Sequence, residues 1–564
     1  MKHIRHSITC LFDLPDEILL IICRYLSPYD VLYAFYTPSE PEQRLHRMIL
    51  DHRTRIKIDE IQKNEYDHLF KLFSHSETPL RPKSLILNNE HVTCLTYYYF
   101  SYTPEDVIRS MFSNLKCLTL IDCLQEDLQY LNKYIENLTE LQYLHIVIRR
   151  RDEYEDMEDL KTCHILFNQL LFNEKQISSI HTIDYKIYNG LLLNKSLKSH
   201  DNLRSVNLVL QTIDDLYILL NGLVPNVQMM IIKLCRSTID SFHYPQYVRC
   251  TCPRLTDFTL FDSSSDFDVD DMKSILAYMT NLVILTLSIH FTFDPLFCHG
   301  PTIESILNEY LPHLLQFHYT ITHCIGQRIL IENFVQWPMN VKYYHVEHLK
   351  WVHIYSLPWP ANKNDKRQFP FKGAGLKPSV SSDVKRSAFR KYAIITDCNK
   401  FRCLNTEFDH VCEVISSVSI DIKLPFNIYK VVFSSDTPPF PIGAIIQSSV
   451  YHLIVERYLL DDYEMLRLAH QFPHVKYLNL ILPSNKHSLI NCLNIFRDRK
   501  DNIKKTSCYW TKLICFSTKL DSMHRANIAS DSQLYDWLNQ YTTSKDQKNF
   551  IKYVNPSPNL TIWY

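Results

Sequence analysis

One spacing of apolar residues recurs along this chain, with apolar side chains three and five positions after the first. The seven clearest copies begin at residues 115, 141, 203, 227, 255, 282 and 314. Neighbouring copies are 24 to 32 residues apart, except for one gap of 62 residues that leaves room for two units with an insertion. The copies are Leu115-Leu118-Leu120, Leu141-Leu144-Ile146, Leu203-Val206-Leu208, Val227-Met230-Ile232, Leu255-Phe258-Leu260, Leu282-Leu285-Leu287 and Leu314-Phe317-Tyr319.

Helical stretches lie between these copies, and several begin with two adjacent acids. The pairs are Asp214-Asp215, Asp270-Asp271 and Asp461-Asp462. Acidic side chains favour a helix start because they accept hydrogen bonds from unpaired backbone N–H groups and complement the helix dipole. The repeating unit is therefore predicted to be strand, turn, helix, turn. Such units stack into an α/β solenoid of parallel strands alternating with helices.

The spacing resembles the strand signature of leucine-rich repeats. Looser copies extend it through most of the chain, at Val341-Tyr344-Val346, Ile415-Val418-Ile420, Ile428-Val431-Phe433, Val450-Leu453-Val455 and Val475-Leu478-Leu480. We therefore expect an irregular leucine-rich-repeat-like array in two parts, 80–355 and 393–482. A basic loop or linker containing proline and glycine is expected at 356–392, and a C-terminal cap at 483–564.

Three short helices are predicted within residues 8–55. Pro15, Asp16 and Glu17 mark the start of the first helix, Pro28 that of the second, and a capping box at Ser39 that of the third. The stretch from Leu14 to Leu32 resembles the F-box motif. That resemblance implies docking on the Skp adaptor of a cullin-RING ubiquitin ligase core. The residues it implies for the contact are Leu14, Pro15, Ile18, Leu19, Ile22, Leu26, Val31 and Leu32.

A target protein is expected on the face of the strands that the repeated apolar residues leave free. Side chains alternate along a strand, so the residues between the apolar ones face away from the core. The predicted target-binding residues of this concave face are Tyr143, His145, Asn207, Asp257, Thr259, Phe261, Thr286 and His318. Together with the array, the F-box resemblance implies the substrate-recognition subunit of a Skp-cullin-F-box ligase. The alternative is a non-enzymatic interaction scaffold whose first helices only cap the array.

Composition argues against several other classes of protein. The 60 Lys and Arg balance 61 Asp and Glu, which favours neither a nucleic-acid nor a membrane partner. Only 7 glycines occur, whereas nucleotide-binding folds depend on glycine-rich turns. The 17 cysteines lack Cys-x-x-Cys spacing, so no zinc ribbon is expected. No apolar stretch of signal-peptide or membrane-spanning length occurs, so we expect a soluble cytoplasmic protein, with a nuclear alternative from Lys366-Arg367 and Lys385-Arg386.

No catalytic motif is found, so we expect no enzymatic activity, no metal and no cofactor. The acids Asp266, Asp268, Asp270 and Asp271 imitate a calcium loop but lack its glycine and glutamate, and are interpreted as a turn with a helix cap. A second group contains His345, His348 and His353 together with Glu347. Its histidines are interpreted as partly buried structural residues, with a metal or general-base role as the alternative. An enzyme with a site hidden in the array would need a deep pocket with clustered titratable groups.

Overall fold

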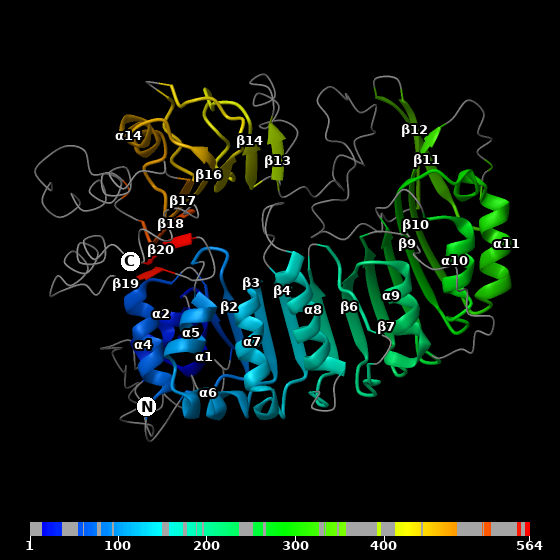
Figure 1. Cartoon of the computed structure of the whole chain (residues 1–564), viewed down its shortest axis with the longest axis horizontal. Helices are drawn as coiled ribbons and strands as arrows, with labels where there is room; N and C mark the ends of the chain where they lie inside the picture. Colours follow the sequence, from blue (N-terminus) through cyan, green and yellow to red (C-terminus); the bar gives the residue numbers. More distant parts are fainter. Residues whose placement is uncertain are drawn as a thin grey trace, which may run out of the picture.

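The computed structural model is a mixed α/β protein in which a large, mostly parallel sheet alternates with helices, as predicted. It contains a 12-stranded and an 8-stranded sheet, shown in Figure 1. The residues that the structure describes are 14–26, 28–36, 55–59, 61–75, 80–92, 95–148, 157–172, 177–187, 189–194, 197–235, 252–262, 267–325, 332, 334–346, 349–356, 392–395, 412–441, 444–481, 510, 513–519, 550–553 and 559–563.

The first sheet adds its strands in the order in which they occur along the chain, up to β10. These ten strands are parallel to one another, and β11 and β12 form an antiparallel hairpin whose second strand pairs with β10. Figure 1 shows the strands following an arc. The strands are β1 (Arg55–Ile58), β2 (Ser84–Asn88), β3 (Cys117–Cys123), β4 (Tyr143–Ile148), β5 (Thr182–Lys186), β6 (Ser205–Leu210), β7 (Met229–Leu234), β8 (Asp257–Asp262), β9 (Ile284–Thr292), β10 (Gln316–Ile325), β11 (Met339–Val346) and β12 (Leu349–Ser356).

The repeated apolar residues form the core, as their spacing predicts. In β4, Leu144 and Ile146 are fully buried, whereas their neighbours Tyr143 and His145 are half-buried. The gap of 62 residues contains one further unit, because β5 lies between β4 and β6 in the sheet. Its buried residues Ile183 and Tyr185 continue the same ladder.

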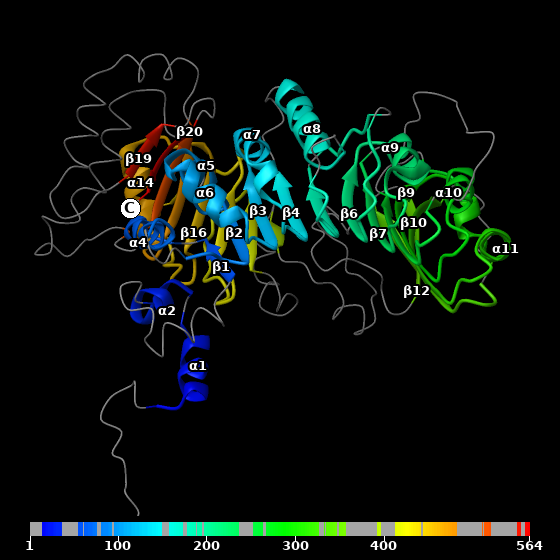
Figure 2. The same cartoon turned by 90° about the horizontal axis from the view of Figure 1, so that it is seen from below.

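Helices cover one face of the first sheet, as Figure 2 shows. Their buried side chains belong to the same hydrophobic cluster as the buried strand residues. We call the other face of this sheet the open face. The helices of this region are α4 (Lys63–Phe73), α5 (Leu95–Tyr102), α6 (Glu105–Phe112), α7 (Gln125–Lys133), α8 (Met157–Phe172), α9 (Ile213–Ile218), α10 (Val269–Leu276) and α11 (Gly300–Tyr310), with short turns η2 (Ile135–Asn137), η3 (Leu219–Leu223) and η4 (Pro295–Cys298).

Asparagines in the turns before the strands join neighbouring units. The Nδ2 atoms of Asn202, Asn226 and Asn281 donate to the backbone carbonyls of Ser178, Asp201 and Pro253 at 2.7, 2.9 and 3.0 Å. Each bond reaches back to the turn that precedes the neighbouring strand. These three asparagines therefore link each unit to the one before it.

The second sheet repeats this arrangement with fewer strands. Strands β13 to β18 are parallel and in chain order, and β20 again pairs antiparallel with the last of them, with β19 outermost. Helix α14 (Asp462–Gln471) lies between β16 and β17. The strands are β13 (Tyr392–Ile395), β14 (Glu413–Ser416), β15 (Lys430–Phe433), β16 (His452–Tyr458), β17 (Tyr477–Ile481), β18 (Cys515–Lys519), β19 (Phe550–Tyr553) and β20 (Asn559–Trp563).

The two sheets touch where the second one meets the loop that follows β2. Lys430 Nζ lies 3.3 Å from Glu90 Oε1 and 3.7 Å from Glu413 Oε2. The ring of His91 packs against His452 and Tyr477, with centroids 5.1 and 4.4 Å apart. The amino ends of β15, β16 and β17 therefore meet the carboxyl end of β2, which places the second sheet along one border of the first (Figure 1).

Several predicted segments differ from the observed elements. The first sheet begins at β1, before residue 80, and the second continues beyond residue 482 through β18, β19 and β20. Val341-Tyr344-Val346 was predicted to begin another parallel unit, but β11 belongs to an antiparallel hairpin. The copy Ile415-Val418-Ile420 was also predicted as a strand, but the observed strand β14 ends at Ser416, before Val418 and Ile420. The predicted third helix around Ser39 and nearly all of the linker 356–392 lie outside the described residues.

Candidate functional site

The first candidate surface is formed by two N-terminal helices, α1 (Asp16–Arg24) and α2 (Pro28–Phe35). Apolar side chains of these helices and the turn between them are exposed, with Ile18 at 42% and Tyr25 at 87% of full accessibility. Figure 2 shows α1 standing clear of both sheets. We call this set the helical surface: Pro15, Ile18, Ile21, Tyr25, Leu26 and Tyr33.

The residues predicted to contact the adaptor divide into two groups. Pro15, Ile18 and Leu26 are exposed, and Leu14 and Ile22 are half-buried. Leu19, Val31 and Leu32 are buried, which assigns them to packing within the chain rather than to a surface offered to a partner. Ile21, Tyr25 and Tyr33 were not in the predicted contact set. Their exposure could not be predicted, because α1 and α2 are apolar on more than one side and the sequence does not show which side of each helix is buried.

The second candidate surface is the open face of the first sheet. The residues predicted for the target lie on it in ladders across the strands: His145 on β4, Asn207 on β6, Thr259 on β8, Thr286 on β9 and His318 on β10 share one row with Asp184 and Ile231. Tyr143 and Asp257 belong to the preceding row. Phe261 and Thr286 are buried, whereas the other predicted residues are half-buried.

A polar cluster occupies the open face where β4 meets β5. Asp184 Oδ2 lies 3.5 Å from His145 Nε2 and 3.2 Å from Lys186 Nζ. Burial lowers the pKa of His145, and the opposing effect of Asp184 is smaller. Burial also raises the pKa of Tyr143, with Asp184 nearby as a second cause. A histidine held neutral beside a carboxylate can donate or accept hydrogen bonds, which suits recognition of a polar partner.

Asp184 and Lys186 were not among the predicted residues, because the strand that carries them, β5, was not predicted individually within the gap of 62 residues. The signal was present, since Ile180, Ile183 and Tyr185 follow the repeated spacing and are buried. Applying the alternation rule to this copy would have assigned Asp184 to the open face.

A second charged group on the open face is Asp257. Burial raises the pKa of its carboxyl group, and His318, two strands away on β10, has a smaller opposing effect. Asp257 and the cluster around Asp184 lie on β8 and β5, so the first sheet separates them by three strand spacings, about 14 Å.

The residues considered as metal ligands have other roles wherever the structure describes them. Asp268 is the N-cap of α10 and accepts a hydrogen bond from the Asp271 N–H at 2.8 Å, which agrees with the predicted helix cap. His353 is buried with its Nδ1 atom 3.0 Å from Thr322 Oγ1. The side chains of His345, Glu347 and His348, and all of Asp266, lie outside the described residues. Among the described residues, no group of His, Cys, Asp and Glu is arranged to hold a metal ion.

Comparison with protein-family models found no match, and a search of curated proteins also found none. Within the described part of the chain, no helix has the length and apolar character needed to cross a membrane. The inference of function therefore depends on the two surfaces themselves.

Proposed function

We propose that this chain is a non-enzymatic adaptor. An F-box formed by the N-terminal helices docks on the Skp adaptor of a cullin-RING ubiquitin ligase. An irregular leucine-rich-repeat solenoid, built on the two sheets, binds the target protein and presents it to the ligase. The division of the chain into these two modules is part of the proposal.

The observation that carries the proposal is the exposed apolar helical surface on α1 and α2. Ile18, Ile21 and Tyr25 leave apolar area in water that a protein partner would cover. Leu19 and Cys23 on the other side of α1 are buried, so the helix has both a packed side and a free side. This is the division expected of a helix that joins two proteins.

The open face of the first sheet supports the second half of the proposal. Its half-buried side chains include the hydroxyl of Tyr143, the imidazoles of His145 and His318 and the amide of Asn207. Such a mixture of aromatic and polar groups on a rigid sheet suits a protein partner, because each side chain is already ordered before binding.

The test is calorimetric titration of the full chain with a recombinant Skp adaptor. Wild-type chain should bind, and an Ile18→Ala, Tyr25→Ala double variant should lose about 2 kcal/mol or more of binding free energy, as central interface residues do. The matched control is Leu460→Ala, Tyr463→Ala, because both of these residues are exposed apolar side chains on the second sheet's side of the molecule. The control should bind like the wild type.

Two results would count against the proposal. Absence of binding by the wild-type chain would leave an interaction scaffold without ligase recruitment. Equal losses in both double variants would mean that any exposed apolar residue contributes, and that α1 has no specific role.

A further inference from the structure

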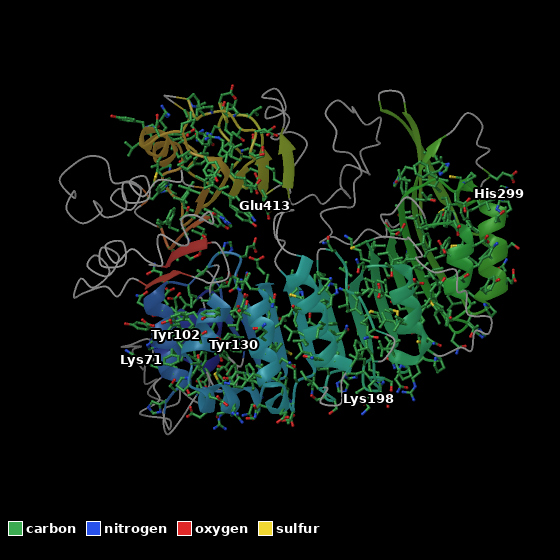
Figure 3. The ribbon with its side chains drawn as sticks, viewed as in Figure 1. Lys71, Tyr102, Tyr130, Lys198, His299 and Glu413 are labelled. Carbon is green, nitrogen blue, oxygen red and sulfur yellow. The ribbon has the colours of Figure 1, made fainter. Side chains whose placement is uncertain are left out.

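Three positively charged side chains, with a glutamine and a histidine between them, lie along the border of the first sheet that is opposite the second sheet. Just before the strands β2 to β6 begin, the chain carries Lys83, Lys116, Gln142, His181 and Arg204 in turn. We call these five residues the basic border. Figure 3 labels Lys198, a further lysine on the same side of the sheet.

Backbone hydrogen bonds hold the basic border in one row across neighbouring strands. The carbonyl of Lys83 accepts from the N–H of Lys116 at 2.8 Å, that of Lys116 from Gln142 at 2.8 Å, that of Gln142 from His181 at 2.9 Å, and that of His181 from Arg204 at 2.8 Å. The residues are therefore spaced like adjacent strands, about 4.8 Å apart, and the row spans about 19 Å.

The side chains of this row are available to a partner. Lys83, Lys116, Gln142 and His181 are exposed, and Arg204 is half-buried. Neither Lys83 nor Lys116 has a carboxylate within ion-pairing distance in the described part of the chain, whereas Lys133 and Lys273 on the helices are each paired with an acid. Arg204 Nη1 donates to the backbone carbonyls of Asp201, Leu203 and Asn226, and among the described residues Arg204 forms no ion pair with a carboxylate.

Acidic groups near the row are fewer than the basic ones. Arg81 adds a further exposed positive charge in the turn before β2. By sequence, the segments leading to β2 to β6 contain five acids, Glu77, Glu136, Glu140, Glu174 and Asp201, against seven Lys and Arg, namely Arg81, Lys83, Lys116, Lys175, Lys195, Lys198 and Arg204. The hydroxyls of Ser84, Tyr143, Thr182 and Ser205 follow directly at the first positions of β2, β4, β5 and β6. Three cations in a row with two polar side chains, and hydroxyl donors beside them, match a chain of carboxylates.

We propose that the basic border binds an extended acidic segment of the target protein. This inference rests on the proposed role of the array in binding a target, and specifies the chemistry of that target. An extended chain advances about 3.3 Å per residue, so about six residues would cover the row. The net charge of −1 for the whole chain means that attraction is local to this border rather than general.

The experiment measures binding of a fluorescein-labelled octaglutamate peptide to the full chain by fluorescence anisotropy at low ionic strength. A Lys83→Glu, Lys116→Glu variant should bind the peptide about tenfold more weakly or worse, with a shallower salt dependence. The matched control is Lys71→Glu, Lys161→Glu, because these lysines are exposed on α4 and α8 and the change in charge is the same (Figure 3 labels Lys71). The control should bind like the wild type.

Three results would overturn the inference: no peptide binding by the wild type, equal losses in both variants, or tighter binding of an eight-nucleotide oligothymidine at the same lysines. Both charge variants should still bind the Skp adaptor, since the helical surface is unchanged. A wild-type chain that binds the adaptor but not the peptide would reject this inference alone, and one that binds the peptide but not the adaptor would reject only the ligase docking.

Discussion

The imidazole of His164 lies on α8 and accepts a hydrogen bond at its Nδ1 atom from the N–H of Leu192, at 2.7 Å. Burial lowers the pKa of this histidine to about 4. Protonation would place a hydrogen on the accepting nitrogen and break the bond, so a neutral ring is required for the packing of α8 against the segment that precedes β6.

The sign of the resulting pH dependence follows from the two pKa values. The folded pKa of about 4 lies below the ordinary value of 6.5, so the folded protein binds fewer protons than the unfolded chain between them. We therefore expect that titration of His164 does not change the free energy of unfolding above pH 6.5. As the pH falls from 6.5 towards 4, titration of His164 should lower the free energy of unfolding. The contribution of this residue is on the order of 3 kcal/mol at most.

A His164→Asn variant tests this, because its side-chain oxygen can replace the accepting nitrogen without taking up a proton. Thermal unfolding of both proteins should be compared at pH 7.5 and pH 5. The variant should lose less stability on acidification than the wild type. An identical loss in the two proteins would show that His164 does not couple to pH.

At the scale of the helix, a carboxylate at the third helical position joins neighbouring units. Asp215 Oδ2 accepts from the N–H and hydroxyl of Thr212 at 2.9 and 2.8 Å, and Oδ1 accepts from the N–H of Leu193 at 2.7 Å. Glu464 has the same position in α14, where it accepts from the N–H groups of Leu460 and Phe440. Each carboxylate both closes its own helix start and holds the preceding segment.

Asp215→Ala should therefore destabilise the protein far more than Asp214→Ala. The first change removes a cap and leaves the buried N–H of Leu193 without its acceptor, for a loss of about 2 to 4 kcal/mol. The second removes an acid of the same helix turn whose side chain is half-buried, for about 0.5 kcal/mol. Urea unfolding followed by circular dichroism measures both. Equal losses would mean that only the helix dipole matters.

The whole molecule depends on a contact between two sheets of the same design. Lys430 lies between Glu90 of the first sheet and Glu413 of the second. Tyr477, Ile514 and Cys515 of the second sheet belong to the large hydrophobic cluster that runs through the first. The two sheets should therefore unfold together.

Replacing Lys430 by Met should weaken that coupling, because the buried carboxylate of Glu413 would lose its cation. Removing one partner of a buried ion pair typically costs about 3 to 5 kcal/mol, and the partial exposure of Glu90 lowers our expectation to about 2 kcal/mol. Scanning calorimetry should show the single transition of the wild type broadening or separating. The control is Lys423→Met, an exposed lysine on the same side of the molecule. A single sharp transition in the Lys430 variant would contradict this coupling.

The pattern within short segments was enough to predict strands β3, β4 and β6 to β10 of the first sheet and the starts of α9, α10 and α14. Alternation along a strand separates core from surface wherever one face is buried, so Leu144 and His145 could be assigned from their neighbours alone. Paired acids marked helix starts for a similarly local reason, since a cap bonds to backbone groups only two or three residues away.

Contacts between distant segments decided the rest. The capping box of Thr212 and Asp215 is local, but the bond from the N–H of Leu193, about twenty residues earlier, cannot be predicted from it. The pairing of Glu90 with Lys430 joins positions 340 residues apart. The basic border likewise exists only because parallel pairing brings five separate turns into one row. Local sequence could predict which side chains leave the core, whereas only the tertiary arrangement determines which of them become neighbours.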